Sequence, residues 1–265
     1  MKKKIKVLGI IPARMASSRL PGKPLAKIYG IPMIGHCYLR SKQSTLLTDC
    51  YVATPDLEIK NYLKSINGHF VMTSHKHKMC HDRVVEAVKK IEKNKKIKYD
   101  IIVNIQGDLP MVFPDMIDQV VLPLIKSKDV KTTTMKDQIF NNKDFFDHNR
   151  VKVITDIHNN LILTSREPIP SIKKYNKKFK KYKHVALRAY KRKTFSEISR
   201  LKMTPIEKIE AIDELRLIEN GIKIKTVLTK KITETVDTIQ DLKKVIRMMR
   251  DDKLRKKYFS THLSH

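Results

Sequence analysis

Residues 5–25 read IKVLGIIPARMASSRLPGKPL, an apolar run that passes directly into a basic loop. The run at 5–11 consists mostly of aliphatic and β-branched side chains, which predicts a buried strand. The loop after it combines arginines and a lysine with serines, prolines and a glycine, and such residues interrupt regular structure. The stretch therefore predicts a fold in which a central strand delivers a charged loop to one end of a sheet.

Three more short apolar runs follow along the chain, at 50–54, 69–73 and 99–106. The stretches between the strands have helical length and apolar residues at helical spacing, at 32–44, 56–66 and 81–95. Alternating strands and helices predict an α/β fold, with a mostly parallel central sheet and helices on both faces. Ligands of such sheets bind beyond the carboxyl ends of the strands.

The alternation loosens beyond about residue 130. Two strands at 149–156 and 160–170, joined by a turn, precede a basic loop of poor periodicity at 171–183. We expect this region to be an insertion that covers a site or meets a partner chain.

The rest of the chain resumes regular structure with one long helix over 204–221. Thr204 is its expected N-cap, Glu207 stands three residues later, and Gly221 is the expected stop. A strand and a final helix follow, at 222–229 and 238–250.

No repeat and no clear linker divides the chain. We therefore expect a single domain over 1–250, in which about 130–200 forms a sugar-binding or dimerisation insertion, and a C-terminal tail at 251–265. The sequence of the tail, DDKLRKKYFSTHLSH, indicates no function of its own. A helical continuation with an exposed end is the expectation for it.

The chain is strongly basic, with 56 lysines and arginines against 27 acidic residues and a formal net charge of +29. One hypothesis is a nucleic-acid-binding protein, because clustered cations bind phosphate backbones. Here, however, lysines are scattered along the sequence and tryptophan is absent, which favours a solvated basic surface without a specific nucleic-acid partner. The nucleic-acid hypothesis predicts salt-sensitive binding that does not need a pair of carboxylates.

The sequence also bears on the cellular compartment. No run of about 18 apolar residues is present, and only about six follow the N-terminal lysines, too few for a signal peptide. We expect a cytoplasmic protein without membrane insertion. Cys37, Cys50 and Cys80 are odd in number and lack C-x-x-C spacing, so we expect reduced and mostly structural thiols.

The loop at 12–25 differs from the common phosphate-binding signatures. GKP stands where a Walker loop has G-K-[S/T], and the loop is no dinucleotide fingerprint. Arg14, Arg19 and Lys23 nevertheless place three cations on one short segment, whose small side chains let backbone N–H groups approach a polyanion. We expect a triphosphate there, and an ordinary basic surface loop is the alternative that the residues leave open.

Two aspartates are candidate metal ligands. Asp108 lies in VNIQGDLP (103–110), which carries Gln106 and Asp108 to the same edge of the sheet as the basic loop. A carboxylate beside phosphates is unfavourable unless a cation lies between them, which indicates Mg²⁺, and a turn or helix cap is the alternative. Asp237 in ETVDTIQDL precedes a predicted helix, and by itself this pattern favours an N-cap.

Taken in order, these segments resemble one known family. IIPARxxSxRLPGKPL, VNxQGDxP, VKV with SRxxIP, PxExIE with ELR, and VDTxxDL match the 3-deoxy-manno-octulosonate cytidylyltransferases, the CMP-Kdo synthetases, over about residues 5–248. The loop alone would indicate only the wider group of sugar nucleotidyltransferases. The order of the motifs along nearly the whole chain makes the resemblance specific.

The resemblance implies a Rossmann-like nucleotide-diphospho-sugar transferase fold and a homodimer. It also implies a cytidylyltransferase that couples CTP to a 2-keto-3-deoxy sugar acid, Kdo first of all. The products would be a CMP-sugar and pyrophosphate, with Mg²⁺ as cofactor, for lipopolysaccharide or capsule synthesis.

Individual roles are implied in the same way. The positions for nucleotide binding are Ala13, Arg14, Ser17, Arg19, Lys23 and Gln106. Those for catalysis are Lys23, Arg14 and Asp108, and those for the metal are Asp108 and Asp237. Those for the sugar acid are Arg166, His184, Glu207 and Glu210. Without the resemblance, a surface ion pair accounts for Arg166 and a strand start for His184. A solvated helix face accounts for Glu207 and Glu210.

The chain departs from the family pattern at several places. Leu109 stands where the family often has an acidic residue, and MCH at 79–81 replaces a Ser-Gly-Thr run. RAYK at 188–191 replaces Tyr-Gly-Tyr-Arg, and Asp213-Glu214 replaces Glu-Gln. Because these changes surround the expected sugar site, 8-amino-Kdo and a nonulosonate such as sialic acid stay open as acceptors. A sugar phosphate or another alcohol is a further alternative within the same fold.

Overall fold

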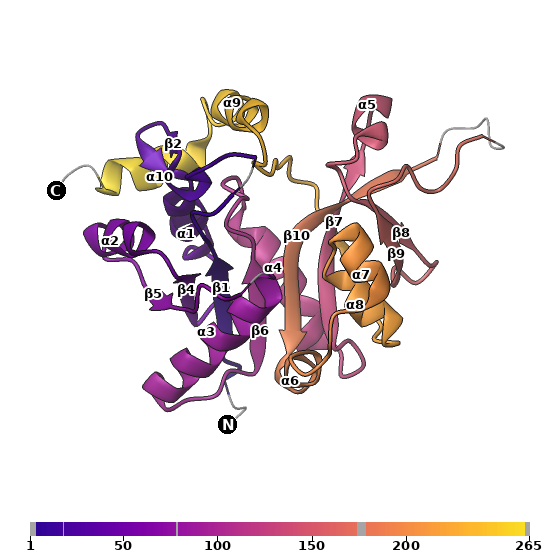
Figure 1. Cartoon of the computed structure of the whole chain (residues 1–265), viewed down its shortest axis with the longest axis horizontal. Coiled ribbons are helices and arrows are strands. Elements are labelled where there is room, and N and C mark those ends of the chain that lie inside the picture. The colour runs from indigo at the N-terminus through magenta and orange to yellow at the C-terminus, as the bar shows by residue number, and fades with distance from the viewer. Residues whose placement is uncertain (1–3, 18, 78, 174–178, 263–265) are drawn as a thin grey trace. The chain divides into compact units, whose positions relative to one another are not determined.

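The computed structural model describes residues 4–17, 19–77, 79–173 and 179–262. The chain divides into two compact units (Figure 1). Unit 1 comprises Met1–Asp118 with Ile232–His265, and unit 2 comprises Gln119–Lys231. Unit 2 includes the stretch at 130–200 in which we expected an insertion, and its role in sugar binding or dimerisation stays a prediction.

Unit 1 contains a parallel sheet. Its strands are, in spatial order, β6 (Ile101–Ile105), β1 (Val7–Pro12), β4 (Asp49–Thr54) and β5 (Phe70–Met72). Every residue of β1 and β6 is buried, so this sheet is covered on both faces. The strands predicted in this part of the chain are confirmed.

Three predicted helices of unit 1 are also confirmed, as α1 (Met33–Ser41), α2 (Leu57–Ser65) and α3 (Cys80–Lys95). The chain crosses the sheet from β1 through α1 to β4 in one direction, and returns from β5 through α3 to β6 in the other. Right-handed crossovers place α1 and α3 on opposite faces. The predicted α/β fold, with a mostly parallel sheet between helices, is therefore confirmed.

A small substructure lies between β1 and α1. It consists of a 3₁₀ turn, η1 (Lys23–Leu25), and an antiparallel pair, β2 (Lys27–Ile28) and β3 (Ile31–Pro32). Far along the chain, α9 (Ile239–Met248) packs against it in one apolar cluster. The buried members of that cluster are Ile28, Met33, Met111, Val236, Leu242, Val245 and Met249. Segments near both ends of the chain are thus joined in unit 1.

The chain ends in α10 (Lys253–His262), which also belongs to unit 1. The predicted helical continuation is present, and Tyr258 within it is only 5% exposed. The lysine-rich sequence around this tyrosine has too few apolar residues to reveal a buried face.

Unit 2 is built on a mixed sheet. β7 (Thr132–Ile139) pairs in parallel with β11 (Lys225–Leu228) and antiparallel with β10 (Lys181–Lys191). β8 (Lys152–Thr155) and β9 (Leu161–Ser165) form an antiparallel hairpin, which confirms the two strands predicted before the basic loop. β10 takes up the last residues of that loop, and residues 174–178 of the loop lie outside the described residues.

Short helices complete unit 2: α5 (Asn142–Phe146), α6 (Arg192–Ile198), α7 (Pro205–Glu210) and α8 (Glu214–Glu219). A longer one, α4 (Pro114–Lys126), begins in unit 1 and ends in unit 2. Within the described part of the chain, no helix has the length and apolar character needed to cross a membrane.

The single helix predicted over 204–221 is wrong. Two helices, α7 and α8, take its place, and Ala211 between them has the left-handed φ of 53°. The predicted start of the helix is confirmed: Thr204 is the N-cap, and its backbone N–H donates to the Glu207 carboxylate at 3.2 Å. Gly221 follows α8 with a φ of 70°, so the predicted stop is also confirmed.

A buried ion pair explains the break. Arg216 of α8 donates from Nε and Nη2 to the two carboxylate oxygens of Glu207 at 2.8 and 2.7 Å. In one straight helix, residues nine apart are separated by about 13 Å along the axis, so this contact requires the chain to turn. Glu207 is fully buried, and an unpaired buried charge costs about 3–5 kcal/mol. A tertiary contact thus overrides the local helical preference.

Candidate functional site

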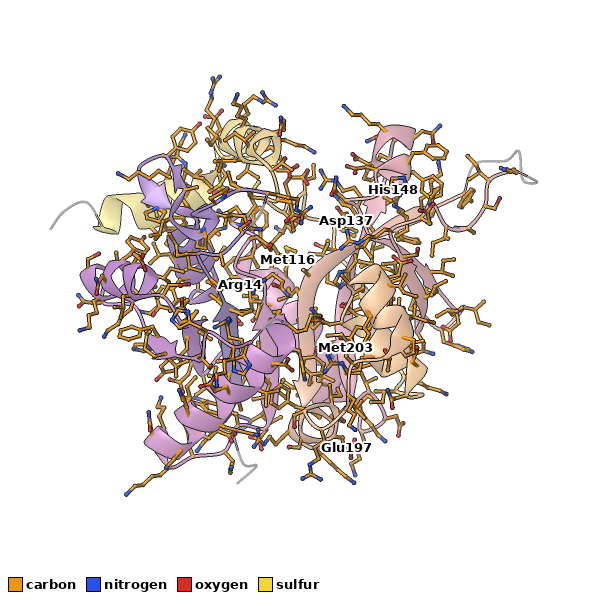
Figure 2. All side chains as sticks on the ribbon, in the orientation of Figure 1. Arg14, Met116, Asp137, His148, Glu197 and Met203 are labelled. Atoms are coloured by element: carbon orange, nitrogen blue, oxygen red, sulfur yellow. The ribbon has the colours of Figure 1, made fainter. Side chains whose placement is uncertain are left out.

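The basic loop leaves the carboxyl end of β1, where Arg14 is exposed (Figure 2). Ala13 continues the strand, since its N–H donates to the carbonyl of Ala53 at 2.9 Å. The N–H of Met15 donates to the Asp56 carboxylate at 2.7 Å, which fixes the backbone of the loop. The contact of Asp56 was missed in the sequence analysis, although its place two residues after the strand predicted at 50–54 puts it at the same sheet edge.

Lys23 lies at the centre of a group of charged side chains that also contains Asp108 and Asp237, here called the carboxylate cluster. Its Nζ donates to Asp108 Oδ2 at 3.0 Å, to the Val236 carbonyl at 2.8 Å and to Asp237 Oδ1 at 3.3 Å. Burial alone would lower the pKa of Lys23, but the charges and hydrogen bonds of the two carboxylates outweigh this effect and raise it. The predicted catalytic lysine and both predicted metal ligands therefore lie in direct contact.

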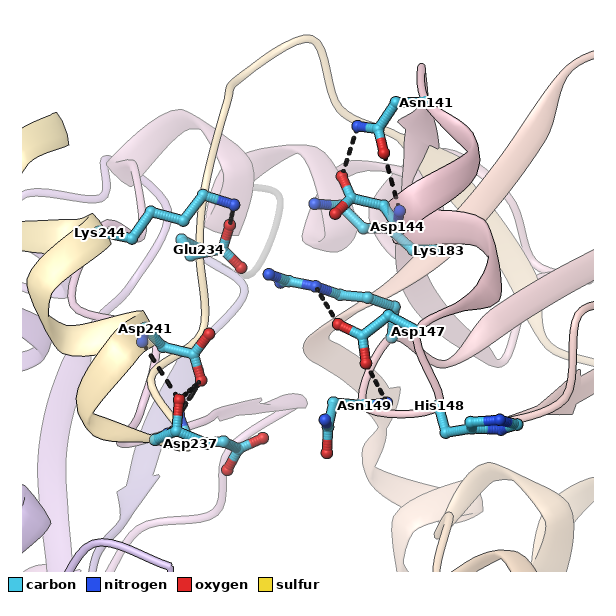
Figure 3. Close-up of polar contacts among 12 residues, drawn as sticks. Asn141, Asp144, Asp147, His148, Asn149, Lys183, Glu234, Asp237, Asp241 and Lys244 are labelled. Atoms are coloured by element: carbon cyan, nitrogen blue, oxygen red, sulfur yellow. Dashed lines mark hydrogen bonds and ion pairs between the residues drawn. The ribbon is translucent and has the colours of Figure 1, made fainter.

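Asp237 does not cap α9, so the N-cap interpretation is wrong. Thr238 is the N-cap: its Oγ1 accepts from the Asp241 N–H at 3.2 Å, and the Asp241 carboxylate accepts from the Thr238 N–H at 2.9 Å (Figure 3). The Asp237 carboxylate instead accepts from Lys23, and it pairs with Arg19 Nη2 at 3.0 Å. The cap lies one residue later than predicted, and this leaves Asp237 to face the basic loop.

Asp108 reaches the cluster from the turn that follows β6. Its backbone carbonyl accepts from the N–H of Val236 at 2.9 Å, and its carboxylate accepts from Lys23. Gly107 before it is tightly enclosed, because a Cβ there would lie 2.6 Å from the carbonyl oxygen of Pro12. Only glycine fits at this close approach of two strand ends, which explains the G-D pair of the motif. The carboxylate takes no helix-cap role in the structure.

The carboxylates of Asp108 and Asp237 are suitable ligands for Mg²⁺. Mg²⁺ in proteins is bound by one or two carboxylates, and substrate phosphates and waters complete its shell. Asp108 and Asp237 lie close enough for a single ammonium group to contact both. Within the described ranges, no group of three or more His, Cys, Asp or Glu residues is placed to hold a metal. The assignment of these two aspartates as metal ligands stays a prediction.

Gln106 lies beside an unexpected partner. Its Nε2 is 3.2 Å from Cys80 Sγ, and the same sulfur lies 3.7 Å from Nδ2 of buried Asn104. Cys80 therefore contacts a predicted nucleotide-binding residue. Cys37 and Cys50 are buried, and burial raises the pKa of Cys50 to about 12, as expected of structural thiols.

Unit 2 brings Arg166 and Glu210 together. The backbone N–H of Arg166 donates to Glu210 Oε2 at 2.9 Å, and Arg166 Nε donates to the Glu210 carbonyl at 2.8 Å. Ser165 Oγ donates to the other carboxylate oxygen of Glu210 at 2.6 Å. Both oxygens of Glu207, by contrast, are held by Arg216, so its geometry indicates a structural role. Its predicted contact with sugar stays untested, while the solvated-face alternative for Glu207 is wrong.

His184 belongs to a second charged group in unit 2. Its Nε2 lies 2.6 Å from Glu214 Oε1, and Arg188 Nε lies 3.2 Å from the same oxygen. Arg188 Nη2 also pairs with Asp213 at 3.1 Å. Burial alone would raise the pKa of Glu214, but the charges of Arg188 and His184 hold it well below its usual range. Three positions that depart from the family pattern are therefore in mutual contact.

Comparisons with known proteins identify the family of this chain. A protein-family model for cytidylyltransferases matches residues 8–224. The 3-deoxy-manno-octulosonate cytidylyltransferase of Geobacter metallireducens is 37% identical over 255 residues, which covers 92% of this chain and 98% of that protein. The chain belongs to this cytidylyltransferase family. The enzyme of the same description from Fusobacterium nucleatum subsp. nucleatum is 38% identical over 251 residues, with coverage of 95% and 100%.

The fold agrees with a solved structure from the cytidylyltransferase family. A CMP:2-keto-3-deoxy-manno-octonic acid synthetase complexed with CTP superposes with a TM-score of 0.83 at 33% identity. The superposition covers 92% of this chain and 98% of the other. The predicted family, the nucleotidyltransferase-like α/β fold and the class of enzyme are thus confirmed for this cytidylyltransferase, whereas the roles of its individual residues remain predictions.

Proposed function

We propose that this chain transfers the cytidylyl group of CTP to the sugar acid Kdo and releases pyrophosphate. The observation that carries the proposal is the contact of Lys23 with Asp108 and Asp237, beside a basic loop at the carboxyl end of a parallel sheet. Relatives and a structural neighbour whose names specify Kdo support this acceptor.

The reaction joins a hydroxyl group to phosphorus. The C2 hydroxyl oxygen of the sugar acid attacks the α-phosphorus of CTP, the bond from that phosphorus to pyrophosphate breaks, and the hydroxyl proton passes to solvent. Arg14 and Arg19 hold the phosphates, and Lys23 stabilises the charge that develops on the α-phosphoryl oxygens. Catalysis then consists mainly of positioning and charge neutralisation, without a covalent enzyme intermediate.

We also propose that Asp108 and Asp237 hold Mg²⁺, which would neutralise phosphate charge and orient the leaving group. The pair fits because it presents two carboxylates from separate segments within reach of one cation. Lys23 holds the pair together through its own ammonium group. Its contacts would therefore rearrange when a metal and phosphates bind.

For the acceptor we propose the polar groups of unit 2. Arg166 offers a cation for the sugar carboxylate, and His184 and Glu210 offer partners for hydroxyl groups. Glu214 holds His184 at Nε2, which fixes the orientation of the imidazole ring. Kdo is the first acceptor to test, and 8-amino-Kdo, a sialic acid and a sugar phosphate are the alternatives.

We propose a homodimer as the working form, in the cytoplasm, for the synthesis of lipopolysaccharide. Large apolar side chains are exposed on unit 2, among them Phe140 (81%), Ile157 (92%) and Ile162 (52%). Where such side chains form one contiguous patch, they are typical of a surface that meets a partner. Light scattering after size-exclusion chromatography measures the mass directly, and a monomer at micromolar concentration would contradict the proposal.

The test of the reaction is pyrophosphate release from CTP and Mg²⁺ over a panel of Kdo, 8-amino-Kdo, a sialic acid and a sugar phosphate. We expect turnover with Kdo and a loss of about 10²–10³-fold in Asp108→Asn, because the cation that would neutralise the reacting phosphates loses one of its two carboxylate ligands. Asp251→Asn is a matched control, since Asp251 is 83% exposed. Turnover that is equal in the two variants, or turnover with none of the sugar acids, would exclude the proposed reaction.

A further inference from the structure

The C-terminal helix α10 is tied to α1 by a buried hydrogen bond. Tyr258 places its hydroxyl 2.5 Å from Nδ1 of His36, and Nε2 of the same ring is 2.8 Å from the Ile28 carbonyl. Because a carbonyl only accepts, Nε2 carries the hydrogen and Nδ1 accepts from the tyrosine hydroxyl. His36 is fully buried, so both of its ring nitrogens are satisfied by fixed partners.

A buried ion pair makes a second tie, one helical turn further along α1. Arg40 is fully buried, and its Nη1 pairs with Asp252 Oδ1 at 3.0 Å. The Nε of the same guanidinium donates to the Val112 carbonyl at 2.7 Å, in the segment that follows Asp108. Asp252 therefore supplies the countercharge for an arginine that fixes the loop after β6.

Arg255 makes the third tie, to the turn between β2 and β3 and to the end of α9. Its guanidinium carbon lies 4.1 Å from the ring centroid of Tyr29, and its Nε donates to the Met249 carbonyl at 2.9 Å. The hydroxyl of Tyr29 donates in turn to the Ile246 carbonyl at 3.0 Å. The β2–β3 turn, which follows the segment of Lys23, and helix α9, which follows Asp237, thus have a common support.

Helix α1 carries these contacts to the carboxylate cluster. Between His36 and Arg40 lies Cys37, whose Sγ donates to the Gly107 carbonyl at 3.4 Å. Gly107 is also enclosed by α1, because a Cβ there would lie 3.4 Å from Ile34 Cδ1. A shift of α1 must therefore displace the turn that presents Asp108.

We propose that Asp252 and Tyr258 are positioning residues for cytidylyl transfer: by fixing α1, they hold Asp108 in register with Lys23 and Asp237. The inference rests on the proposed function for its catalytic consequence, but its structural part stands independently. It gives a role to the tail, whose sequence alone indicated none.

The test compares Asp252→Asn with Asp251→Asn in the full chain. The two aspartates are neighbours with the same charge, but Asp252 is buried against Arg40, whereas Asp251 is 83% exposed and pairs with exposed Lys256. Asparagine keeps an oxygen acceptor for the Arg255 N–H, which donates to Asp252 Oδ1 at 2.6 Å, so the start of α10 is preserved. The difference between the variants therefore reports the buried countercharge.

We expect kcat of Asp252→Asn to fall about 10- to 100-fold while KM for CTP changes less than about threefold, because small displacements of a catalytic group mainly affect the transition state. Asp252→Glu restores part of kcat, and Tyr258→Phe gives a smaller loss in the same direction. The control Asp251→Asn keeps the wild-type values. A folded Asp252→Asn with unchanged kcat would show that the tail only adds stability, and would overturn the proposal.

Amide hydrogen exchange supplies a readout that needs no activity. Amides of 107–113 should exchange faster in Asp252→Asn than in Asp251→Asn, at a temperature where both are folded. Equal exchange in this segment would contradict the inference even in an active enzyme. Faster exchange in a chain without cytidylyltransferase activity would uphold the structural link and refute only the proposed function.

Discussion

The backbone N–H of Val236 donates to the backbone carbonyl of Asp108 at 2.9 Å. This one bond joins the end of β6 to the segment before α9, although the two are far apart in the sequence. Asp108 is one predicted metal ligand, and Val236 directly precedes Asp237, the other. The bond therefore sets the spacing of the two carboxylates. The carboxylates at 108 and 237 can therefore be replaced without removing this backbone bond.

Replacement of Lys23 by methionine should lower turnover by about 10²-fold or more, since a charge close to the reacting phosphates is lost. It also leaves Asp108 and Asp237 close together without their shared cation. Mg²⁺ should therefore raise the melting temperature of this variant more than that of the wild type, because like charges repel until a cation binds. Thermal melts with and without Mg²⁺ measure the difference. An equal Mg²⁺ effect in both proteins would argue against metal binding by this pair.

Asp237→Asn and Asp241→Asn should have opposite consequences. Asp241 completes the capping box of α9, so its loss should cost about 1 kcal/mol of unfolding free energy with turnover mostly retained. Asp237 faces Lys23 and Arg19, so its loss should abolish most turnover with a smaller effect on stability. Urea denaturation and pyrophosphate release, measured on both variants, check the pair. Equal loss of turnover would mean that the cap, rather than the carboxylate at 237, determines activity.

Asp56→Ala should weaken the binding of CTP. The Met15 N–H loses its acceptor, so the basic loop is no longer fixed in one conformation. KM for CTP is expected to rise about tenfold, the equivalent of about 1.4 kcal/mol. Glu58→Ala is the matched control. Asp56 directly precedes helix α2, and Glu58 lies in the first turn of α2 but is exposed. If both variants raise KM equally, the helix terminus rather than the loop anchor is responsible.

Stability should fall in mild acid because of His36. Burial is the main cause that lowers the pKa of this imidazole, from 6.5 to about 4. Between these two values the unfolded chain binds a proton that the folded chain does not, so stability is lost as pH falls from about 6.5 to about 4. The full effect is on the order of 3 kcal/mol. His36→Gln should flatten this part of the stability profile, while His158→Gln, at an exposed position, should leave it unchanged.

Much of unit 1 was predictable because its signals are local. β1 (Val7–Pro12) and β6 (Ile101–Ile105), predicted at 5–11 and 99–106, are buried along their whole length, so composition alone reveals them. The broken helix was not predictable, because the pair of Glu207 with Arg216 is a tertiary contact and alanine at 211 gives no local sign of a turn. Local rules favour a cap at Asp237 as much as at Thr238, and only the fold decides between them.

The site was predictable in part, because some of its residues lie in local sequence motifs. Motifs in known order located Lys23, Asp108 and Asp237, which the structure brings into contact. The contacts of Asp56 with Met15 and of Cys80 with Gln106 were not predicted, because they depend on which segments meet at the sheet edge. The role of Tyr258 was hidden for a further reason: its partner His36 lies on another helix, far along the chain.

The contacts of Arg188 with Asp213 and Glu214 couple three positions at which this chain departs from the family pattern. Tyrosine at 188, which the family pattern has there, would remove the main counterion of the buried Glu214 carboxylate. Glutamine at 214 alone would remove one of the two carboxylates that pair with buried Arg188. Engineering toward the family pattern must therefore exchange these positions as one block. A single evolutionary change at one of these positions would likewise need a compensating change of charge at another.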